Sequence, residues 1–579
     1  MRGFLILSAG VRQSSGEEIA MSGVNIPIGR SDFADIRRNG YYYIDKSNLI
    51  KELLRTNGIQ VTLITRPRRF GKTLAMSMLS EFFDIRKDSR ELFDGLAVSE
   101  DEKFCGMWRN QFPVLFLTFK SVDGLVFEKA NARLKSVIAQ LFQEHLYLMD
   151  SDKINVYERE VINRLAAKTA SQDEVEDSLR ILTKMIAAYY EKPVILLIDE
   201  YDVPLAKASE NGYYKEMLDV MKGILQVFKD NIFLKYAVMT GCLRIAKESI
   251  FTGTNNFVSD TISDTRLNEY FGFTQEEVDR LLDDTGLQSF EEELREWYDG
   301  YHFGDVDVYC PWDVMNHVQR LLLSPDSAPE NYWENTSDNA VIRTFLRRTD
   351  FDVNEKFEIL LAGDCIKEPV EENLTYDVLE SSEENLWSIL YMTGYLTRVC
   401  PKDVSGQGLL PGWYALKIPN KEVMGIFKKS VKAWFTEITV ERDRQELFSA
   451  LWDGDAEKLT DIISNLLFES ISYHDYAESF YHAFITGLFS NAGYRVESNY
   501  ENGLGRSDIV VKNRKERKAV VLEAKRACCE EKMEKECEEA LAQIERNRYA
   551  EKIEYDGFRN VVKLGIAFFQ KKCLVKKGR

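Results

Sequence analysis

The segment Val61–Thr73 constrains the fold more than any other stretch, because it has the pattern of a strand, a short loop and the start of a helix. Val61–Thr65 is a β-prone apolar run, the next six residues contain proline and glycine, and Leu74–Leu79 has a helical pattern. Backbone N–H groups at such a helix start point toward the loop, and the helix dipole favours an anion there. With Gly71-Lys72-Thr73 at its end, the segment predicts an α/β fold with a phosphate-binding loop.

One position departs from the usual G-x-x-x-x-G-K-[ST] pattern of these loops. Arg66 stands where the first glycine is expected, whereas the second glycine, Gly71, is present. In such a loop Lys72 reaches the β- and γ-phosphates of ATP and Thr73 holds Mg²⁺. Because Gly-Lys-Thr often occurs by chance, the interpretation depends on the flanking strand and helix. The nucleotide-binding residues expected in the loop are Arg66, Arg69, Phe70, Gly71, Lys72 and Thr73.

A second strand supplies the carboxylates that hydrolysis of a nucleotide needs. Val194–Asp199 is apolar and ends in Asp199-Glu200. Asp199 is expected to coordinate Mg²⁺ through water, and Glu200 to orient or deprotonate the attacking water. A strand that ends in two acids can also lead into a solvated loop. Its place after the phosphate loop, in an alternating strand and helix pattern, favours the catalytic interpretation.

A third strand, Phe233–Thr240, brings two further candidates. Thr240, at the tip of this strand, is placed to sense the γ-phosphate, and Arg244 could neutralise charge in the transition state. A purely structural role is an equal alternative for each of them.

The chain of 579 residues is too long for one core, and its pattern divides it into parts. Residues 1–25 are expected to be a tail or a mis-assigned start, with Met21 as the alternative start. Strands and helices alternate over 26–257, which predicts a P-loop domain with a parallel sheet. Residues 258–437 are expected to form a mostly helical lid and connector. The aromatic loop Trp297–Gly304 within it is more typical of packing than of base stacking.

Residues 438–579 have the pattern of a second α/β domain. Helices lead into strand, turn, strand and strand, followed by a long charged helix, the strand Val561–Phe569 and a basic tail. Gly503–Asp508 is a glycine-rich turn that feeds a strand, and Ala519–Lys525 is a second strand. Since alternate residues of a strand share a face, Glu523 and Lys525 project together.

If these two strands pair as a hairpin, Asp508 joins Glu523 and Lys525 around one metal ion. Two carboxylates supply the oxygen ligands that Mg²⁺ prefers, the metal activates a water, and Lys525 positions that water or stabilises charge. The expected target is a phosphodiester. The alternative is a retained fold that binds without cutting.

Three motifs together resemble the bacterial AAA-ATPase-like family. They are Tyr43–Ser47, Arg66–Thr73 and Asp199-Glu-Tyr-Asp-Val-Pro204. The resemblance extends over nearly the whole chain from Ile26 and implies a P-loop ATPase that uses ATP and Mg²⁺. In this family an arginine–proline start of the loop is usual, so Arg66 is a variant and not a defect. The family is commonly fused to a C-terminal nuclease-like domain.

The C-terminal residues resemble the core of the PD-(D/E)XK nuclease superfamily. Asp508 matches the first acid and Glu523-Ala-Lys525 the end of the motif, with Ser507 where the motif's name has proline. The resemblance implies that Glu478, on a preceding helix, is an additional acid. It also implies that Gln543, with Tyr549, belongs to a downstream motif on the helix beside the site.

Charge and cysteine content limit the partners. A net charge of −19 argues against general affinity for nucleic acid, so such binding needs a local basic patch. Basic residues that cluster near the C-terminal strands could supply it: Arg506, Lys512, Arg514, Lys515, Arg517, Lys518, Lys525, Arg526, Lys571, Lys572, Lys576 and Lys577. The nine cysteines include no C-x-x-C pair, which fits a reducing cytoplasm. No apolar run approaches the roughly 18 residues that a membrane span needs.

These patterns favour an ATP-hydrolysing protein with a Mg²⁺-dependent nuclease-like C-terminal domain, in which ATP turnover gates or drives action on nucleic acid. DNA is the expected nucleic acid. The alternative is a nucleotide-switched binding protein whose C-terminal domain recognises nucleic acid or a partner without cleavage. Assembly into a homo-oligomer is compatible with the sequence, although no residue demands it.

Overall fold

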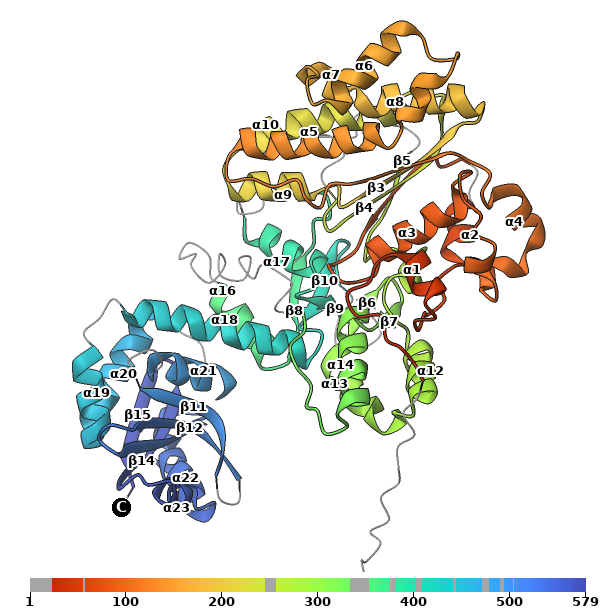
Figure 1. Ribbon diagram of the computed structural model, residues 1–579. Helices are drawn as coiled ribbons and strands as arrows, with labels where there is room; N and C mark the ends of the chain where they lie inside the picture. Colours follow the sequence, from red (N-terminus) through yellow and green to blue (C-terminus); the bar gives the residue numbers. More distant parts are fainter. Residues whose placement is uncertain are drawn as a thin grey trace, which may run out of the picture.

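The protein is described by a computed structural model with three parts, an N-terminal α/β body, a connector and a C-terminal α/β domain (Figure 1). The structure describes residues 23–55, 58–244, 257–333, 353–374, 376, 382–400, 409–440, 444–470, 478–489, 494–502 and 505–578. Within these ranges, no helix has the length and apolar character needed to cross a membrane.

The N-terminal body is built around a five-stranded parallel sheet of order β2-β3-β4-β1-β5. The strands are β1 (Val61–Thr65), β2 (Val114–Thr118), β3 (Val194–Asp199), β4 (Leu234–Gly241) and β5 (Phe257–Asp260). The register pairs Thr65 with Gly241 and Thr118 with Asp199. The carboxyl ends of the central strands therefore meet at one edge, where ligands bind in open α/β sheets.

Helices cover both faces of this sheet (Figure 1). They are α1 (Phe33–Arg38), α2 (Leu49–Leu54), α3 (Lys72–Phe83), α4 (Glu102–Trp108), α5 (Phe127–Gln143), α6 (Val156–Ala166), α7 (Gln172–Glu176), α8 (Ser178–Tyr190), α9 (Val203–Glu210) and α10 (Tyr214–Leu225). Alternate residues of β3 enter two different cores: Ile195 and Leu197 pack with α3, and Leu196 and Ile198 pack with α5, α8 and α10. Burial on both faces explains why β3 is apolar throughout.

The α/β class expected from the sequence is the observed one, and the three predicted strands lie within one residue of β1, β3 and β4. The strand β5 was not predicted. It comprises Phe257-Val-Ser-Asp260, a short edge strand with two polar residues, and it lies at and beyond the expected domain boundary at residue 257.

The connector contains more β-structure than the mostly helical region expected there. Its helices are α12 (Gln275–Thr285), α13 (Glu291–Tyr298), α14 (Pro311–Leu323), α16 (Val353–Leu361), α17 (Glu383–Met392) and α18 (Lys421–Val440). Its strands are the hairpin β6 (Tyr301–Phe303) and β7 (Val306–Val308), and the antiparallel sheet β8 (Ile366–Pro369), β10 (Trp413–Lys417) and β9 (Thr397–Arg398). The predominantly helical expectation was therefore wrong for these segments, which are too short to show a clear alternating pattern.

The C-terminal domain has a five-stranded sheet of order β11-β12-β13-β14-β15, antiparallel except for the parallel pair β13 and β14. The strands are β11 (Arg495–Asn502), β12 (Gly505–Asn513), β13 (Lys518–Arg526), β14 (Asn560–Phe569) and β15 (Lys572–Lys577). The helices are α19 (Arg444–Asp453), α20 (Ala456–Ser470), α21 (Glu478–Phe489), α22 (Met533–Arg546) and α23 (Tyr549–Tyr555). The segment read as a basic tail is the edge strand β15, in which Cys573 and Val575 are buried.

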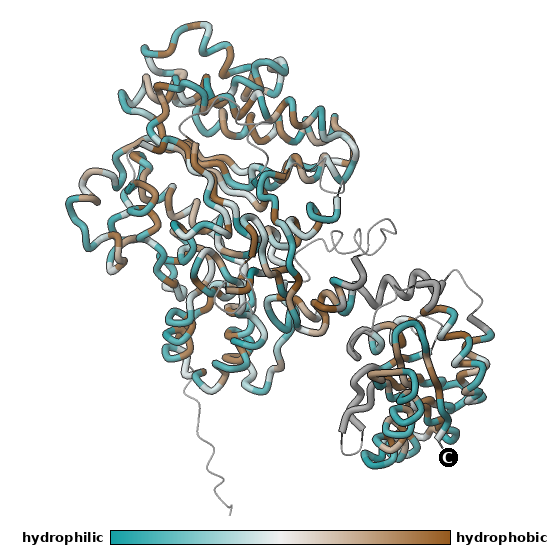
Figure 2. The backbone as a smooth tube through the Cα atoms, turned by 180° about the vertical axis from the view of Figure 1, so that it is seen from behind, coloured by the Kyte–Doolittle hydropathy of each residue, from teal (hydrophilic) through white to brown (hydrophobic). Residues whose placement is uncertain are grey.

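The long helix α18 joins the body to this domain. It contacts α13 and α16 of the connector and α21 of the C-terminal domain. Figure 2 shows hydrophobic strands running through the centre of both the body and the C-terminal domain. Buried residues of the body, the connector and the C-terminal sheet belong to one continuous cluster, which includes Ile64, Phe427 and Leu522.

Candidate nucleotide and nuclease sites

The loop between β1 and α3 curves around the side chain of Lys72. Gly71 precedes α3 with a φ of 83°, a conformation that glycine adopts without strain. The Lys72 side chain is buried, and its Nζ donates to the carbonyl oxygens of Arg66 and Pro67, both at 2.9 Å. Burial opposes this positive charge, but the Cys242 sulfur and the neighbouring acids outweigh burial, and the pKa of Lys72 is raised. A fixed cation therefore lies inside the loop.

Three sequence-predicted side chains meet at the carboxyl ends of β1, β3 and β4. The Thr73 hydroxyl donates to Asp199 Oδ2 at 3.0 Å, and the Thr240 hydroxyl donates to Asp199 Oδ1 at 2.6 Å. Burial raises the pKa of Asp199, while these two hydrogen bonds oppose the shift. Hydroxyl and carboxylate oxygens are the ligands that Mg²⁺ prefers, so Thr73 and Asp199 fit such an ion.

Glu200 occupies an unusual backbone conformation beside this group. Its φ of 55° lies in the left-handed region, which costs a residue other than glycine on the order of 1–3 kcal/mol. Its backbone N–H lies 3.4 Å from Thr240 Oγ1, and its side chain lines the same cavity as Lys72 and Thr73. The strained turn thus directs a carboxylate into the cavity.

Asp202 also lies in this region, although no role for it was predicted from the sequence. It is buried and accepts hydrogen bonds from the backbone N–H groups of Cys242 and Leu243, at 2.9 and 3.0 Å, and from the hydroxyl of Tyr376 at 3.1 Å. It therefore ties the turn after β3 to the end of β4 and to the connector. An acid that follows a strand by three residues carries no sequence signal that distinguishes this role from a solvated one.

Arg66 does not line the cavity, in contrast to the prediction that it contacts nucleotide. Its buried guanidinium pairs with Asp260 Oδ1 at 2.7 Å and donates to the carbonyl oxygens of Thr65 and Asp260. The rings of Phe271 and Phe303 lie 5.2 and 5.7 Å from its Cζ atom. Where the usual pattern has glycine, this arginine anchors the loop to the end of β5.

Arg69 and Phe70 line the cavity, but their side chains also contact the connector. The Arg69 Cζ atom lies 4.2 Å from the ring centroid of Trp312, on α14. The buried ring of Phe70 packs against Tyr301 and Phe303 at 5.0 and 5.1 Å between centroids. The aromatic hairpin β6–β7 thus packs onto the loop. Contacts of Arg69 and Phe70 with a nucleotide stay a prediction.

Arg244, at the edge of the described residues, is half-buried and is not among the residues that line the cavity. Its predicted role in neutralising charge stays a prediction that the described geometry does not favour.

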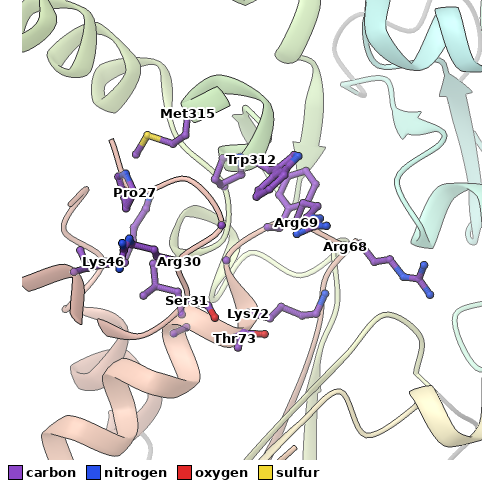
Figure 3. Close-up of a pocket in the computed structure, with 18 of the residues that line it drawn as sticks. Pro27, Arg30, Ser31, Lys46, Arg68, Arg69, Lys72, Thr73, Trp312 and Met315 are labelled. Carbon is purple, nitrogen blue, oxygen red and sulfur yellow. The ribbon is translucent and has the colours of Figure 1, made fainter. Parts of the chain in front are cut away.

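The cavity at the loop has a volume of about 470 Å³, within the usual range for small-molecule sites. Figure 3 shows Lys72 and Thr73 at one side, with Pro27 and Arg30 of the N-terminal segment and Trp312 and Met315 of α14 at the other. The cavity therefore has a polar end at the loop and a more apolar end between the N-terminal segment and the connector. This division suits a ligand with a phosphate part and a flat organic part.

Hydrogen bonds connect the loop to the first turn of α18. The indole Nε1 of Trp333 donates to the carbonyl oxygen of Arg68 at 3.4 Å, and the backbone N–H of Trp333 donates to Glu422 Oε1 at 2.7 Å. Glu422 on α18 and Asp313 on α14 are both fully buried. Burial, together with repulsion from Asp313, raises the pKa of Glu422, and burial also raises the pKa of Asp313. The pair is therefore expected to hold a proton at neutral pH.

Glu422→Gln is expected to stabilise the protein increasingly as pH rises. The pKa of Glu422 is raised in the folded protein, so the unfolded chain loses this proton near pH 4.3 and the folded chain loses it only at a higher pH. Between these two pH values the folded wild type binds more protons than the unfolded chain, and its free energy of unfolding therefore falls as pH rises. Glutamine cannot ionise and still accepts the Trp333 hydrogen bond. Since one pKa unit corresponds to about 1.4 kcal/mol, we expect a gain of roughly 1 kcal/mol or more at pH 9. Thermal unfolding at pH 5, 7 and 9 measures it.

Glu296→Gln is the control for this measurement, because Glu296 forms an exposed ion pair with Lys421, the residue beside Glu422. A difference between Glu422→Gln and the wild type that is the same at all three pH values would contradict shared protonation.

In the C-terminal domain, three predicted residues lie together. Glu523 on β13 is buried, and its Oε1 accepts a hydrogen bond from Gln543 Nε2 on α22. Lys525 Nζ lies 3.9 Å from the same oxygen. The parallel crossover from β13 through α22 to β14 brings Gln543 over the strand. The expectation that Glu523 and Lys525 share a face agrees with this geometry.

The two other predicted acids are described by backbone alone. Asp508 is in β12 and Glu478 begins α21, and the side chains of both lie outside the described residues. Strands β12 and β13 pair in antiparallel fashion with Ile509 opposite Leu522, and the same register continued by one residue brings position 508 opposite Glu523. The hairpin that the site requires is thus present. Metal binding by Asp508 and Glu523 stays a prediction, since no cluster of three metal-ligating side chains occurs among the side chains that are described.

Several lysines of the predicted basic patch have acidic partners. Lys512 is buried and pairs with Glu497 at 2.7 Å, and Lys518 pairs with Glu516 at 2.9 Å. On β15, Lys572 pairs with Glu530, and Lys576 pairs with Glu534 and Glu538. The charges of these lysines are therefore partly neutralised by neighbouring carboxylates.

Comparisons with known proteins match two separate parts of the chain. Residues 27–251 match the AAA-ATPase-like family, described as a predicted AAA-ATPase, and residues 476–578 match the PD-(D/E)XK nuclease superfamily. An uncharacterized protein in the vnfD 5′ region of Azotobacter chroococcum mcd 1 is 26% identical over 505 residues, which cover 85% of this chain and 87% of that protein. The alignment with the Aeropyrum pernix ORC2 structure (ADPNP–ADP complexes) covers 70% of this chain and 95% of that chain at 10% identity, with a TM-score of 0.23.

Proposed function

We propose that this chain, which carries an AAA-ATPase-like region and a PD-(D/E)XK superfamily region, hydrolyses ATP with Mg²⁺ to control a nuclease-like domain that acts on nucleic acid, with DNA as the expected target. One observation carries the first half: the hydroxyls of Thr73 and Thr240 both donate to the Asp199 carboxylate beside the buried Lys72. Such a group at the carboxyl ends of parallel strands is suited to phosphate and metal, not to packing alone.

Each residue of the nucleotide site has a role that fits its position. Lys72 would bind the β- and γ-phosphates, and Thr73 and Asp199 would hold Mg²⁺, which when bound neutralises phosphate charge. Glu200 faces the cavity and would orient the attacking water and accept its proton. Thr240 fixes the orientation of Asp199 through its hydroxyl.

The C-terminal site is proposed to cut a phosphodiester. Asp508 and Glu523 would hold Mg²⁺, with Glu478 as an additional acid. Lys525 would position the attacking water or stabilise charge. Gln543 holds Glu523 in place by its amide hydrogen bond, which supports a positioning role. The helix α18 contacts both the connector and α21, and would transmit nucleotide turnover to this domain.

The second candidate is a nucleotide-switched binding protein that does not cut. The ion pairs of Lys512, Lys518, Lys572 and Lys576 favour the form of this candidate that binds a partner other than nucleic acid, because they leave less positive charge for phosphates. The two candidates differ in the chemistry at Glu523 and share the nucleotide site.

Glu200→Gln is expected to keep ATP bound and to stop its turnover. Glutamine retains the shape of the side chain but cannot accept a proton, and loss of a general base typically lowers kcat by about 10²- to 10⁴-fold. Phosphate release measures turnover, and calorimetric titration with ATP measures affinity, which we expect to change less than about threefold because Lys72 and Thr73 are retained.

Glu191→Gln is the control, since Glu191 is exposed and pairs with Lys153 far from the cavity. Wild-type protein that releases no phosphate with Mg²⁺ or Mn²⁺ would contradict the ATPase half of the proposal. Phosphate release without cleavage of DNA or RNA would favour the binding protein.

A further inference from the structure

The loop contains a third arginine, Arg68, for which no role was predicted from the sequence. It is half-buried, and its side chain lines the same cavity as Lys72, Thr73 and Glu200. Figure 3 shows the side chains of Arg68 and Lys72 extending to the same side of the loop, whereas Arg69 lies beside Trp312. Arg68 thus lies at the phosphate end of the cavity.

The three arginines of the loop differ in what they contact. Arg66 pairs with Asp260, and Arg69 stacks on Trp312. For the Arg68 guanidinium, the described part of the chain provides no hydrogen bond and no ion pair; its backbone carbonyl is what Trp333 holds. A guanidinium has five donors in a fixed fork, and at this place in the cavity they are accessible to a ligand.

The surroundings of Arg68 identify the chemistry of that ligand. Glu200 and Asp202 are the acids whose charges act on Arg68, and Lys72 is a second cation of the same cavity. A planar guanidinium matches phosphate oxygens in a bidentate way, and a cavity with Lys72 and Thr73 at one end is suited to the phosphate chain of a nucleotide. Lys72 would bind the β- and γ-phosphates, and Arg68, at the same end of the cavity, would add a second cation at the terminal phosphate.

We propose that Arg68 contacts the γ-phosphate of a bound nucleoside triphosphate and is a catalytic residue of its hydrolysis; this inference rests on the proposed ATPase function. In that reaction a water oxygen bonds to the γ-phosphorus, and the bond from this phosphorus to the β–γ bridging oxygen breaks. The proton of the water passes to Glu200, and ADP leaves with the electron pair of the broken bond. Arg68 makes and breaks no bond. It stabilises the charge on the γ-phosphate oxygens as the bond breaks.

This assignment replaces the one expected for Arg244. A charge-neutralising arginine must reach the reacting phosphate, and Arg68 lines the cavity whereas Arg244 does not. Since Arg68 comes from the phosphate loop itself, the site would need no arginine from a second copy of the chain.

The test compares the affinities for ADP and for a non-hydrolysable imido analogue of ATP, each with Mg²⁺, and the kcat and KM for ATP. We expect the wild type to bind the triphosphate analogue more tightly, and Arg68→Ala to lose this preference while its ADP affinity changes less than about threefold. We expect kcat to fall by roughly 10²- to 10³-fold. Arg68→Lys should recover part of both, because it keeps charge without the fork.

Three further variants sharpen the result. Arg69→Ala, in the neighbouring position, is expected to affect ADP and the triphosphate analogue alike, since Arg69 lies over Trp312. Arg90→Ala, at an exposed ion pair with Asp88, is the control for loss of an arginine elsewhere. Arg68→Gln keeps most of the side-chain volume. If Arg68→Ala does not fold, the same affinities and kinetic constants are measured on Arg68→Gln, with the same expected result.

The outcomes separate the inference from the proposed function. An unchanged preference for triphosphate with unchanged kcat in Arg68→Ala overturns the inference and leaves the ATPase proposal standing. Equal loss of affinity for ADP and the triphosphate analogue also overturns it, because Arg68 would then act by shaping the loop. A wild type that binds neither nucleotide overturns the proposed function, and the inference with it.

Discussion

Lys72→Ala is expected to abolish ATP hydrolysis, with phosphate release falling by at least roughly 10²- to 10³-fold and ATP affinity falling as well. The Lys72 ammonium is buried inside the loop, and its raised pKa keeps it charged over the whole physiological range. A buried cation interacts with phosphate far more strongly than an exposed one, because little water screens it. Phosphate release and calorimetric titration with ATP and ADP measure both effects.

The same substitution removes the two hydrogen bonds that Lys72 donates to the carbonyl oxygens of Arg66 and Pro67. Loss of these bonds could loosen the loop, so thermal unfolding of the variant must accompany the kinetics. Lys153→Ala is the matched control, since Lys153 forms an exposed pair with Glu191. Turnover that is unchanged in Lys72→Ala, in a folded protein, would show that the loop does not serve ATP hydrolysis.

The residues of the nucleotide site that could be predicted from the sequence are those identified by the pattern of their own strand or loop. Strand β3 is apolar along its length because both of its faces are buried, and it ends in Asp199 at the sheet edge where Thr73 and Thr240 also lie. Once a parallel sheet is assumed, these three residues follow from the ends of their strands. Sequence alone could thus place Thr73, Asp199 and Thr240 at one site.

The role of Arg66 could not be predicted, because its partner Asp260 lies 194 residues away on a strand that the pattern did not reveal. The same holds for Asp313 and Glu422, which are buried beside each other although a charged residue on a helix usually faces solvent. Long-range pairing of charges leaves no periodic signal in the sequence. Arg68 was missed for a related reason: three arginines in one loop look alike until their surroundings are known.

In the C-terminal domain, the alternation of side chains along a strand predicted one strand correctly and failed to reveal another. In β13, Glu523 and Lys525 were expected on one face, and the two side chains lie 3.9 Å apart. In β15, lysines hid the strand, although Cys573 and Val575 are buried and alternate with residues that are exposed or half-buried. An edge strand with lysines is common, because positive charge there prevents pairing with another chain.

Glu523→Ala is expected to abolish metal-dependent cleavage of DNA and to leave DNA binding largely intact. The Glu523 carboxylate is buried, accepts a hydrogen bond from Gln543 and lies near Lys525, so it is the best-supported of the proposed metal ligands. Its loss would remove one of two carboxylates, and a site with a single carboxylate is expected to hold Mg²⁺ poorly. We expect cleavage to fall below detection, a loss of at least roughly 10²-fold, while contacts with the phosphate backbone persist. A gel assay of cleavage with Mg²⁺ or Mn²⁺ and ATP, together with a binding titration in EDTA, measures both.

Two variants keep this result interpretable. Glu523→Gln retains the volume of the side chain, and its amide oxygen can still accept the Gln543 hydrogen bond, so it tests loss of charge in a fold that is disturbed less. Glu516→Ala, in the exposed turn before β13 where Glu516 pairs with Lys518, is the control. Cleavage that survives both substitutions at Glu523 would place the chemistry elsewhere. If the wild type binds DNA and does not cut it under any of these conditions, while it still hydrolyses ATP, the domain acts in binding, and Glu523 then serves to hold α22 against β13 through Gln543.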